Sequence, residues 1–324
     1  MIRHKNRLAV ILMNLGGPDT LDSVRPFLKN LFSDPAIIHL PWPFRPLVAE
    51  VISRARTKKA FKIYQQMGGG SPLLANTKSQ ALHLIQVMQD KLPDQEVEVF
   101  IAMRYWHPLT AEAVAKVKAF RPTEVVLLPL YPQFSSTTTG SSFLEWHKQA
   151  NLQGLKVPTR EIQSYPQDAD FVEAHCDLLL PWIEKASLYG KPRILFSAHG
   201  LPKKIIDAGD PYENQIHQTI RAIMKKLHSS LEGVVCYQSK VGPLKWLEPS
   251  IEQEIRRAGE DKVPVIVVPV AFVSEHSETL VELDRDYRCL AETVGIPFYG
   301  RVSTLSNHPA YMRSLAGLVL TNSN

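Results

Sequence analysis

The run Val265-Ile266-Val267-Val268-Pro269-Val270 is apolar throughout and stands between segments long enough to form helices. Val125-Val126-Leu127-Leu128-Pro129-Leu130 matches it position for position, with a proline fifth in both runs. Short apolar runs that alternate with helix-length segments indicate parallel sheets covered by helices on both faces. Proline cannot donate to a sheet ladder, so we expect each strand to bulge or end there.

Two further segments contain the same features in the same order. Residues 12–18 and 195–202 each contain a strand-like run, a polar turn, a glycine and then a proline. The chain of 324 residues is also long enough for two domains of roughly 150 residues. We therefore predict an α/β protein with two similar domains, 1–150 and 151–304, each a doubly wound parallel sheet, facing across a cleft. A chance likeness between short apolar strands is the alternative.

The same pattern predicts the individual elements. Strands are expected at 8–15, 96–103, 124–130, 193–197, 233–237 and 263–270. Helices are expected at 21–32, 77–92, 109–120, 171–187, 212–228, 249–257, 277–293 and 309–320.

The composition is that of an ordinary globular protein, with 44% hydrophobic and 21% charged residues. A net charge of +5 without blocks of like charge does not indicate a nucleic-acid partner. The three cysteines form no C-x-x-C pair, which argues against a disulfide framework and favours a reducing compartment. The apolar stretch 263–273 is shorter than the roughly 20 residues that span a bilayer. We expect a cytoplasmic protein.

His199 and Glu278 each come shortly after a predicted strand. Open α/β sheets bind ligands at the carboxyl ends of their strands, so both residues are site candidates. An imidazole can accept a proton near neutral pH or bind a metal ion. Gly200 and Pro202 enforce a sharp turn that would fix the direction of the His199 ring. The alternative for a single histidine beside a turn is a capping or hydrogen-bonding role.

Acidic residues recur after the second of these strands. Glu278, Glu282 and Asp286 are four residues apart, which places them on one face of a helix that begins near Ser277. Like charges at this spacing repel each other unless a cation offsets them. Glu278 would stay ionised at the positive end of the helix. We interpret the stripe as a path that attracts a divalent cation, with a solvated surface helix as the alternative.

Aromatic and basic residues indicate a large, flat ligand that carries carboxylates. Cations between Arg54 and Lys62 precede Tyr64, Arg104-Tyr105-Trp106-His107 ends a predicted strand, and Trp246 follows residues 239–243. The chain has no phosphate-binding loop, no G-x-G-x-x-G, no G-x-S-x-G and no HExxH, which argues against nucleotide binding, serine hydrolysis and zincin chemistry.

Together these segments resemble the ferrochelatase family, whose members insert Fe²⁺ into protoporphyrin IX in the last step of haem synthesis. The likeness covers nearly the whole chain, in seven segments that occur in the same order: 14–18, 68–72, 104–110, 131–142, 197–202, 238–243 and 272–280.

The resemblance implies roles for particular residues. His199 and Glu278 would be both catalytic and metal-binding, with Glu282 and Asp286 as a possible delivery path for iron. The division of labour between His199 and Glu278 stays open. The fold would be chelatase-like, with two Rossmann-like domains and a last helix, within about 305–324, that returns to the first domain. The porphyrin pocket would contain Leu15, Tyr64, Arg104, Tyr105, Ser135 and Trp246.

The resemblance also implies cofactors and partners. Fe²⁺ and protoporphyrin IX would be substrates, and no prosthetic group is expected. Some relatives carry a [2Fe–2S] cluster bound partly by C-terminal cysteines; no cysteine follows Cys289, so no cluster is expected. Residues 41–47 are apolar and proline-broken, and the family places a pocket lip here. This lip could touch the inner face of a membrane; the alternative is a buried connection.

Two other functions remain open from the sequence. The chain could be a chelatase for another tetrapyrrole, such as coproporphyrin III or sirohydrochlorin, or for another metal. It could also be a noncatalytic carrier of haem or metal. A carrier has no need of a base opposite an acidic path, which favours the enzyme.

Overall fold

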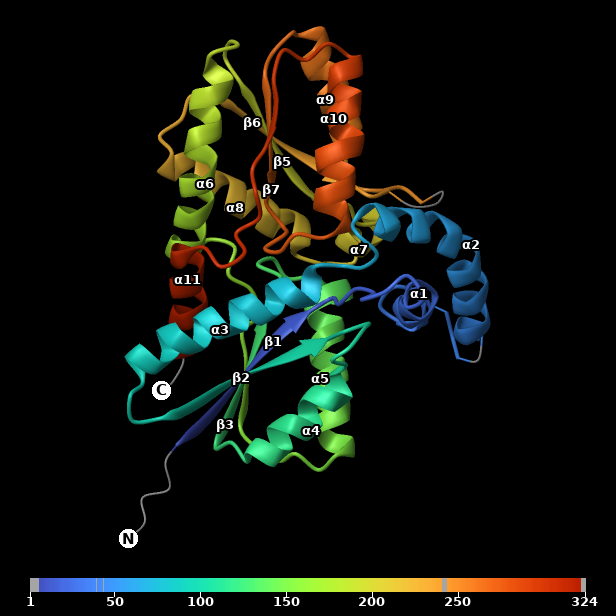
Figure 1. Cartoon of the computed structure of the whole chain (residues 1–324), viewed down its shortest axis with the longest axis vertical. Helices are drawn as coiled ribbons and strands as arrows, with labels where there is room; N and C mark the ends of the chain where they lie inside the picture. Colours follow the sequence, from blue (N-terminus) through green and yellow to red (C-terminus); the bar gives the residue numbers. More distant parts are fainter. Residues whose placement is uncertain (1–5, 39, 43, 241–243, 322–324) are drawn as a thin grey trace. The chain divides into compact units, whose positions relative to one another are not determined.

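The computed structural model describes residues 6–38, 40–42, 44–240 and 244–321 (Figure 1). The chain forms two compact units. Unit 1 comprises Met1–Ser164 and Met312–Asn324, and unit 2 comprises Tyr165–Tyr311. Residues beyond 150 stay with unit 1 because the short strand β4 (Thr159–Glu161) pairs with β3 (Glu124–Pro129) of its sheet.

Unit 1 is built on a parallel sheet with the strand order β2-β1-β3-β4. The central strand β1 is buried along nearly its whole length, because strands pair with it on both sides and helices cover both faces. The predicted strands at 8–15, 96–103 and 124–130 are confirmed, whereas β4 is too short to show a pattern. The other strands of this sheet are β1 (Arg7–Asn14) and β2 (Glu96–Met103).

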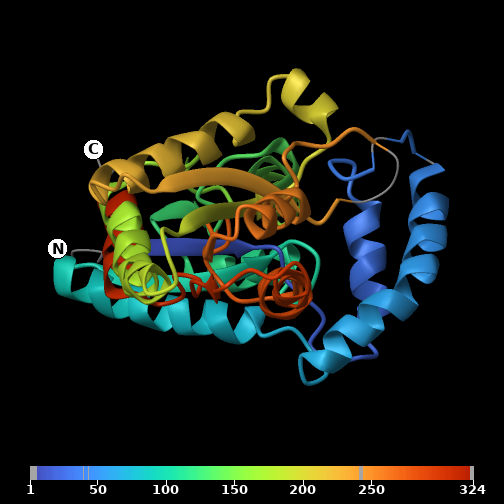
Figure 2. The same cartoon turned by 90° about the horizontal axis from the view of Figure 1, so that it is seen from above.

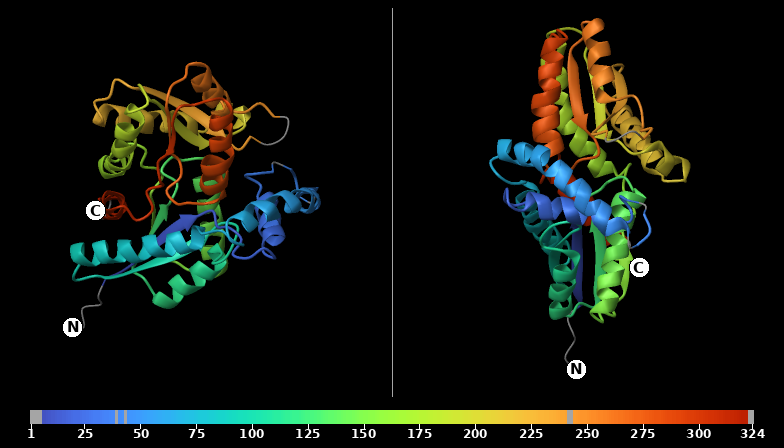
Figure 3. Two further views of the ribbon diagram at one scale, coloured as in Figure 1. Left: turned by 45° about the horizontal axis from the view of Figure 1, so that its top comes forward. Right: turned by 90° about the vertical axis from the view of Figure 1, so that its right-hand side faces the viewer.

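Helices cover the two faces of the unit 1 sheet, with α3 on one side of β1 and α5 on the other (Figure 2). Two further helices, α1 and α2, lie side by side beyond the carboxyl end of β1 (Figures 1 and 3). The helices of this unit are α1 (Val24–Ser33), α2 (Phe44–Gln66), α3 (Leu73–Lys91), α4 (Thr110–Phe120), the π-helix η1 (Ser136–Gly140), α5 (Ser141–Leu152) and most of α11 (Pro309–Leu320).

The long helix α2 was not expected from the sequence, because its apolar residues do not recur on one face. It ends at glycines with positive φ: Gly68 at 90° and Gly69 at 103°. The Gly69 amide donates to the Tyr64 carbonyl at 2.9 Å, which is a common way to close a helix. The loop then reaches Ser71, whose amide donates to the Pro18 carbonyl at 2.7 Å. Two of the segments quoted above, 14–18 and 68–72, are therefore neighbours.

Unit 2 repeats the architecture of unit 1. Its parallel sheet has the order β6-β5-β7-β8, which matches the order of unit 1 strand for strand. The similarity of the two halves that the sequence predicts is therefore confirmed. The strands are β5 (Arg193–His199), β6 (Glu232–Gln238), β7 (Val265–Pro269) and β8 (Tyr299–Arg301). The helices are α6 (Ala169–Ser187), α7 (Lys203–Asp207), α8 (Tyr212–Lys226), α9 (Ile251–Glu260), the π-helix η2 (Glu278–Asp286) and α10 (Tyr287–Thr293).

The prolines of the matching runs end their strands, as expected. Pro129 is the last residue of β3 and Pro269 the last of β7. In each unit the next amide bonds the central strand: Leu130 donates to Met13 at 2.8 Å, and Val270 donates to Ser197 at 3.0 Å. Each proline lacks an N–H to donate, and the chain leaves both sheets at the corresponding point.

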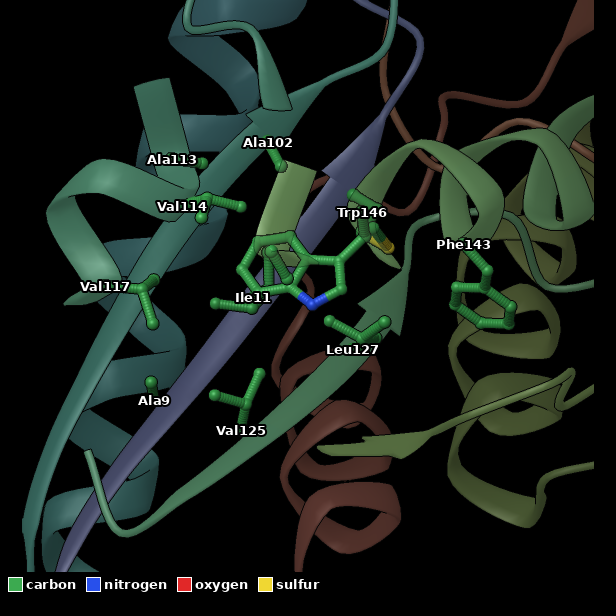
Figure 4. Close-up of a cluster of buried hydrophobic side chains, with 12 residues drawn as sticks. Ala9, Ile11, Ala102, Ala113, Val114, Val117, Val125, Leu127, Phe143 and Trp146 are labelled. Carbon is green, nitrogen blue, oxygen red and sulfur yellow. The ribbon is translucent and has the colours of Figure 1, made fainter. Parts of the chain in front are cut away.

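Trp146 of α5 is fully buried at the centre of a core between α4, α5 and the sheet of unit 1 (Figure 4). The ring lies against small and branched side chains, including Ile11 of β1 and Leu127 of β3. An indole held on all sides leaves a large cavity when it is removed, because the surrounding strands cannot collapse into the space.

We expect Trp146→Ala to lower the free energy of unfolding by about 3–5 kcal/mol. Leu144→Ala is the matched control, because Leu144 lies on the same helix with 73% of its surface exposed. The measurement is urea unfolding followed by circular dichroism. Equal midpoints for the two variants would contradict this account of the core.

Candidate active site

The carboxyl end of the unit 2 sheet brings together the turns that follow β5 and β6. His199 is the last residue of β5 and lies opposite Gln238, the last residue of β6. The amide of Gly200 donates to the Gln238 carbonyl at 2.9 Å. A side chain at Gly200 would approach this carbonyl to 3.0 Å and the Trp246 ring to 3.2 Å. Glycine therefore allows the indole to pack directly beside His199.

His199 and Glu278 form a hydrogen-bonded pair. His199 Nδ1 lies 2.8 Å from Glu278 Oε2, and the two side chains are 38% and 23% exposed. A neutral ring that donates from Nδ1 to the carboxylate leaves Nε2 free to accept a proton or bind a metal ion. The structure thus brings together the two residues that the sequence predicts to be catalytic.

A set of polar side chains surrounds this pair. Gln238 Nε2 donates at 3.1 Å to the Glu278 carbonyl and at 3.1 Å to Glu282 Oε2. Ser239 Oγ donates to the same Glu282 oxygen at 2.7 Å, and Ser197 Oγ donates to Gln238 Oε1 at 2.6 Å. Sequence reasoning assigned no role to these three polar residues, although all three lie in segments that carry the family likeness.

The acidic stripe differs from its prediction. The segment Glu278–Asp286 is a π-helix rather than the start of an α-helix, a form that is rare and frequent at functional sites. Asp286 is half exposed and bonded to the Arg285 guanidinium at 2.9 and 3.0 Å. Among the residues that the structure describes, no three His, Cys, Asp or Glu side chains gather into a metal-binding cluster. A spacing of four residues could not distinguish the two kinds of helix.

Burial and charge shift the protonation of this site in opposite directions. Burial by itself favours a neutral imidazole, but attraction to the Glu278 carboxylate and their hydrogen bond outweigh it and raise the pKa of His199. Burial would raise the pKa of Glu278, yet His199 and His276 lower it. Burial and repulsion from Glu278 raise the pKa of Glu282. Burial lowers the pKa of His276, against the attraction of Glu278 and Glu275.

Unit 1 contains a second polar site, centred on a carboxylate that the sequence analysis missed. Asp34 is 3% exposed, and its Oδ2 lies 2.7 Å from an Arg104 guanidinium nitrogen. Tyr105 donates its hydroxyl to the same oxygen at 2.8 Å, and Arg104 Nε donates to Ser141 Oγ at 2.8 Å. These contacts fix the direction of the Arg104 guanidinium and balance its charge. No local pattern marks Asp34, which lies about 70 residues before its partners.

The other residues expected in the porphyrin pocket lie mostly in unit 1. Tyr64 and Tyr105 are buried in one apolar cluster, with Leu15 packed against it. Ser135 is buried at the start of η1, where its hydroxyl accepts from the Thr137 amide at 3.1 Å. Trp246 belongs to unit 2, where an antiparallel bridge joins it to Pro202. The two tyrosines and Ser135 are buried, whereas Leu15, Arg104 and Trp246 keep part of their surface exposed.

Known proteins resemble the chain along nearly its whole length. The family model named Ferrochelatase matches residues 7–323. A ferrochelatase of Wolbachia sp. subsp. Brugia malayi is 48% identical over 97% of this chain and 99% of its own. A ferrochelatase of Caulobacter vibrioides (strain NA1000 / CB15N) is 51% identical over 97% of this chain and 89% of its own.

Solved structures confirm the chelatase-like fold. The sirohydrochlorin chelatase SirB of Bacillus subtilis subspecies spizizenii, in complex with cobalt, has a TM-score of 0.55 at 11% identity, over 97% of this chain and 94% of its own. CbiX, described as the terminal enzyme for siroheme biosynthesis in denitrifying bacteria, has a TM-score of 0.53 at 11% identity, over 99% and 100%. At this identity the likeness concerns the fold. The family match and the relatives at about half identity show that this chain belongs to the ferrochelatase family.

Proposed function

We propose that His199 and Glu278 perform, at the carboxyl end of the unit 2 sheet, the iron insertion that defines the ferrochelatase family. The chain is a lyase of haem biosynthesis, a metal chelatase that inserts Fe²⁺ into protoporphyrin IX and forms protohaem. The single observation that carries the residue assignment is the 2.8 Å contact between His199 Nδ1 and Glu278 Oε2, with both side chains partly exposed.

The reaction requires a base. One Fe²⁺ replaces two protons on the pyrrole nitrogens, so the protein must accept protons close to the ring. His199 Nε2 takes the two protons one after the other and passes each to solvent, since its side chain is partly exposed, while Glu278 at Nδ1 stabilises the imidazolium that forms each time. The opposite division, in which Glu278 accepts the proton and His199 holds the metal, uses the same geometry.

Iron is a substrate here, so the protein must hold it weakly enough to release it. Imidazole nitrogen and carboxylate oxygen are suitable ligands for Fe²⁺. His199 and Glu278 offer one of each, fewer than a storage site would use. We place Glu282, held by Ser239 and Gln238, next along the path of the ion, and the half-exposed Asp286 at its outer end.

The porphyrin contacts divide between direct and supporting residues. Trp246, Leu15 and Arg104 supply ring and carboxylate contacts in this proposal, since an indole face suits a flat apolar ring and a guanidinium suits a propionate. Within unit 1, Tyr105 shares the Asp34 oxygen with Arg104, and Tyr64 belongs to the buried cluster against which Leu15 packs. Ser135 is buried at the start of η1. Trp246 draws support from its packing against Gly200, next to His199.

We further propose that the chain works without a [2Fe–2S] cluster or other prosthetic group. Cluster ligands are thiolates. Cys176 and Cys236 are buried, and burial raises the pKa of the Cys176 thiol to about 11 and that of Cys236 further, so both stay protonated. Cys289 alone is exposed.

The lip at residues 41–47 is proposed as a membrane contact on the cytoplasmic side. Trp42, Phe44 and Leu47 are 77%, 63% and 67% exposed, so the alternative of a buried connection loses support. Pro43 of this stretch lies outside the described residues. Cations of α2 that follow the lip, such as Arg54 and Lys58, would favour an anionic surface. No helix in the described parts of the chain has the length and apolarity needed to cross a bilayer.

We expect His199→Ala to reduce iron insertion by about 10²–10⁴-fold, because the proton acceptor is lost. Binding of free porphyrin, followed by fluorescence, should be unchanged. His83→Ala is the control, since His83 is an exposed histidine of α3. Running the assay with protoporphyrin IX and coproporphyrin III in parallel distinguishes the two tetrapyrroles. Near-normal turnover by His199→Ala would remove this assignment, and binding without any turnover by the wild type would indicate a carrier.

The pH dependence follows from the raised pKa of His199. The base must be neutral, so kcat/KM should fall as the pH drops through this raised pKa. Glu278→Gln removes the attraction that opposes burial, so the acidic limb should move to lower pH. Glu282→Gln should move it in the same direction by less, because Glu282 contributes less to the shift. The measurement is residual Zn²⁺ insertion against pH, and an unmoved limb in Glu278→Gln would contradict the pairing.

The membrane contact is tested by flotation with vesicles that contain anionic lipid. We expect wild type to float and Trp42→Ser/Phe44→Ser to remain in the dense fraction. Each large apolar side chain that is removed costs about 2–3 kcal/mol of the free energy of transfer from water into the membrane. Leu144→Ser/Leu152→Ser is the matched control, with residues 73% and 70% exposed on α5. Equal flotation of all three proteins would end the proposal.

A further inference from the structure

Arg301 joins two carboxylates that lie on either side of Glu278 in the sequence. Its Nη1 donates to Glu275 Oε1 at 2.6 Å. The guanidinium also holds Asp284 in a two-pronged contact, with Nε donating to Oδ1 at 2.8 Å and Nη2 donating to Oδ2. Only 9% of the Arg301 side chain is exposed, so solvent screens these pairs weakly.

The backbone of Arg301 is part of the unit 2 sheet. Arg301 ends β8 and lies opposite Val267 of β7, and the next amide, that of Val302, donates to the Val267 carbonyl at 2.9 Å. Tyr299, also in β8, donates its hydroxyl to the Leu283 carbonyl at 2.7 Å. The π-helix is therefore held from β8 through one side-chain ion pair and one backbone carbonyl.

The entry to the π-helix is held from the same side. The Thr304 amide donates to Glu275 Oε1 at 3.0 Å, on the oxygen that Arg301 also contacts. Burial would raise the pKa of Glu275, but Arg301 and these hydrogen bonds lower it, so the carboxylate stays ionised. Between these anchors at Glu275 and Asp284, the backbone that carries Glu278 is fixed at both ends.

A π-helix needs such anchors. It is rare as an isolated form, so tertiary contacts must favour it here over an ordinary α-helix. Rewinding the segment as an α-helix would turn Asp284 relative to Glu278, and Arg301 could then no longer meet both carboxylates in this geometry. The two-carboxylate contact and the direction of Glu278 therefore depend on each other.

We propose that Arg301 is a positioning residue for Glu278: by joining Glu275 and Asp284 it keeps the π-helix in the form that places the Glu278 carboxylate on His199. Arg301 contacts no residue of the pair directly and acts through the backbone. This inference rests on the proposed function of Glu278.

The test compares Arg301→Lys with Arg285→Lys. A lysine keeps the charge of Arg301 but cannot make the two-pronged contact. Arg285 lies on the π-helix itself and forms an ion pair with the exposed Asp286, which makes Arg285→Lys a matched control. The readout is single-turnover Zn²⁺ insertion into protoporphyrin with enzyme in excess. We expect about a 10- to 100-fold slower insertion for Arg301→Lys, unchanged porphyrin affinity, and wild-type rates for Arg285→Lys.

A double-mutant cycle separates positioning from a general effect on the fold. If Arg301 acts through Glu278, Arg301→Lys should slow insertion no further once Glu278 is glutamine. The rates of Glu278→Gln and of the double variant should then differ by a factor of about one. The inference would be overturned if the two reductions in insertion rate multiplied in the double variant. It would also be overturned if Arg301→Lys inserted metal at the wild-type rate. Wild-type turnover by Glu278→Gln alone would instead overturn the proposed function of Glu278. If Arg301→Lys does not fold, Asp284→Asn provides the same cycle with the arginine retained.

Discussion

Pairing of the central strand on both sides is the constraint on which the rest of each unit depends. β5 bonds β6 and β7 in parallel, and its counterpart β1 bonds β2 and β3. A parallel register brings all carboxyl ends to one edge, so a side chain that ends one strand meets those that end its neighbours. His199 and Gln238 are adjacent for this reason alone, and the turn at Gly200 adds Trp246 to the same edge.

Charge balance determines how the site at this edge is used. Glu278 contacts His199 and lies close enough to a second carboxylate, Glu282, for the two to repel each other. The histidine lowers the pKa of Glu278, while Glu278 raises the pKa of Glu282. A site with one ionised and one readily protonated carboxylate can attract a divalent cation and also take part in proton exchange.

The sequence predicted most of the fold because its signals are local. Apolar runs and helix-length periods placed the strands β1, β2, β3, β5, β6 and β7 correctly, and the matching prolines marked strand ends in both halves. The sequence missed β4 and β8, whose three residues show no period, and α2, whose stability comes from packing on α1 rather than from one apolar face.

The sequence by itself determined the family, the two halves, the position of His199 at a strand end and that of Glu278 at the start of a helix. Each of these is encoded in a short contiguous segment. Only the tertiary structure decided the π-helix, the buried Asp34 beneath Arg104 and the link from Arg301 to Glu275 and Asp284. These features depend on contacts between residues 17 to 71 positions apart. Such contacts form where the sheet register and helix packing bring distant side chains together, and no local pattern encodes that meeting.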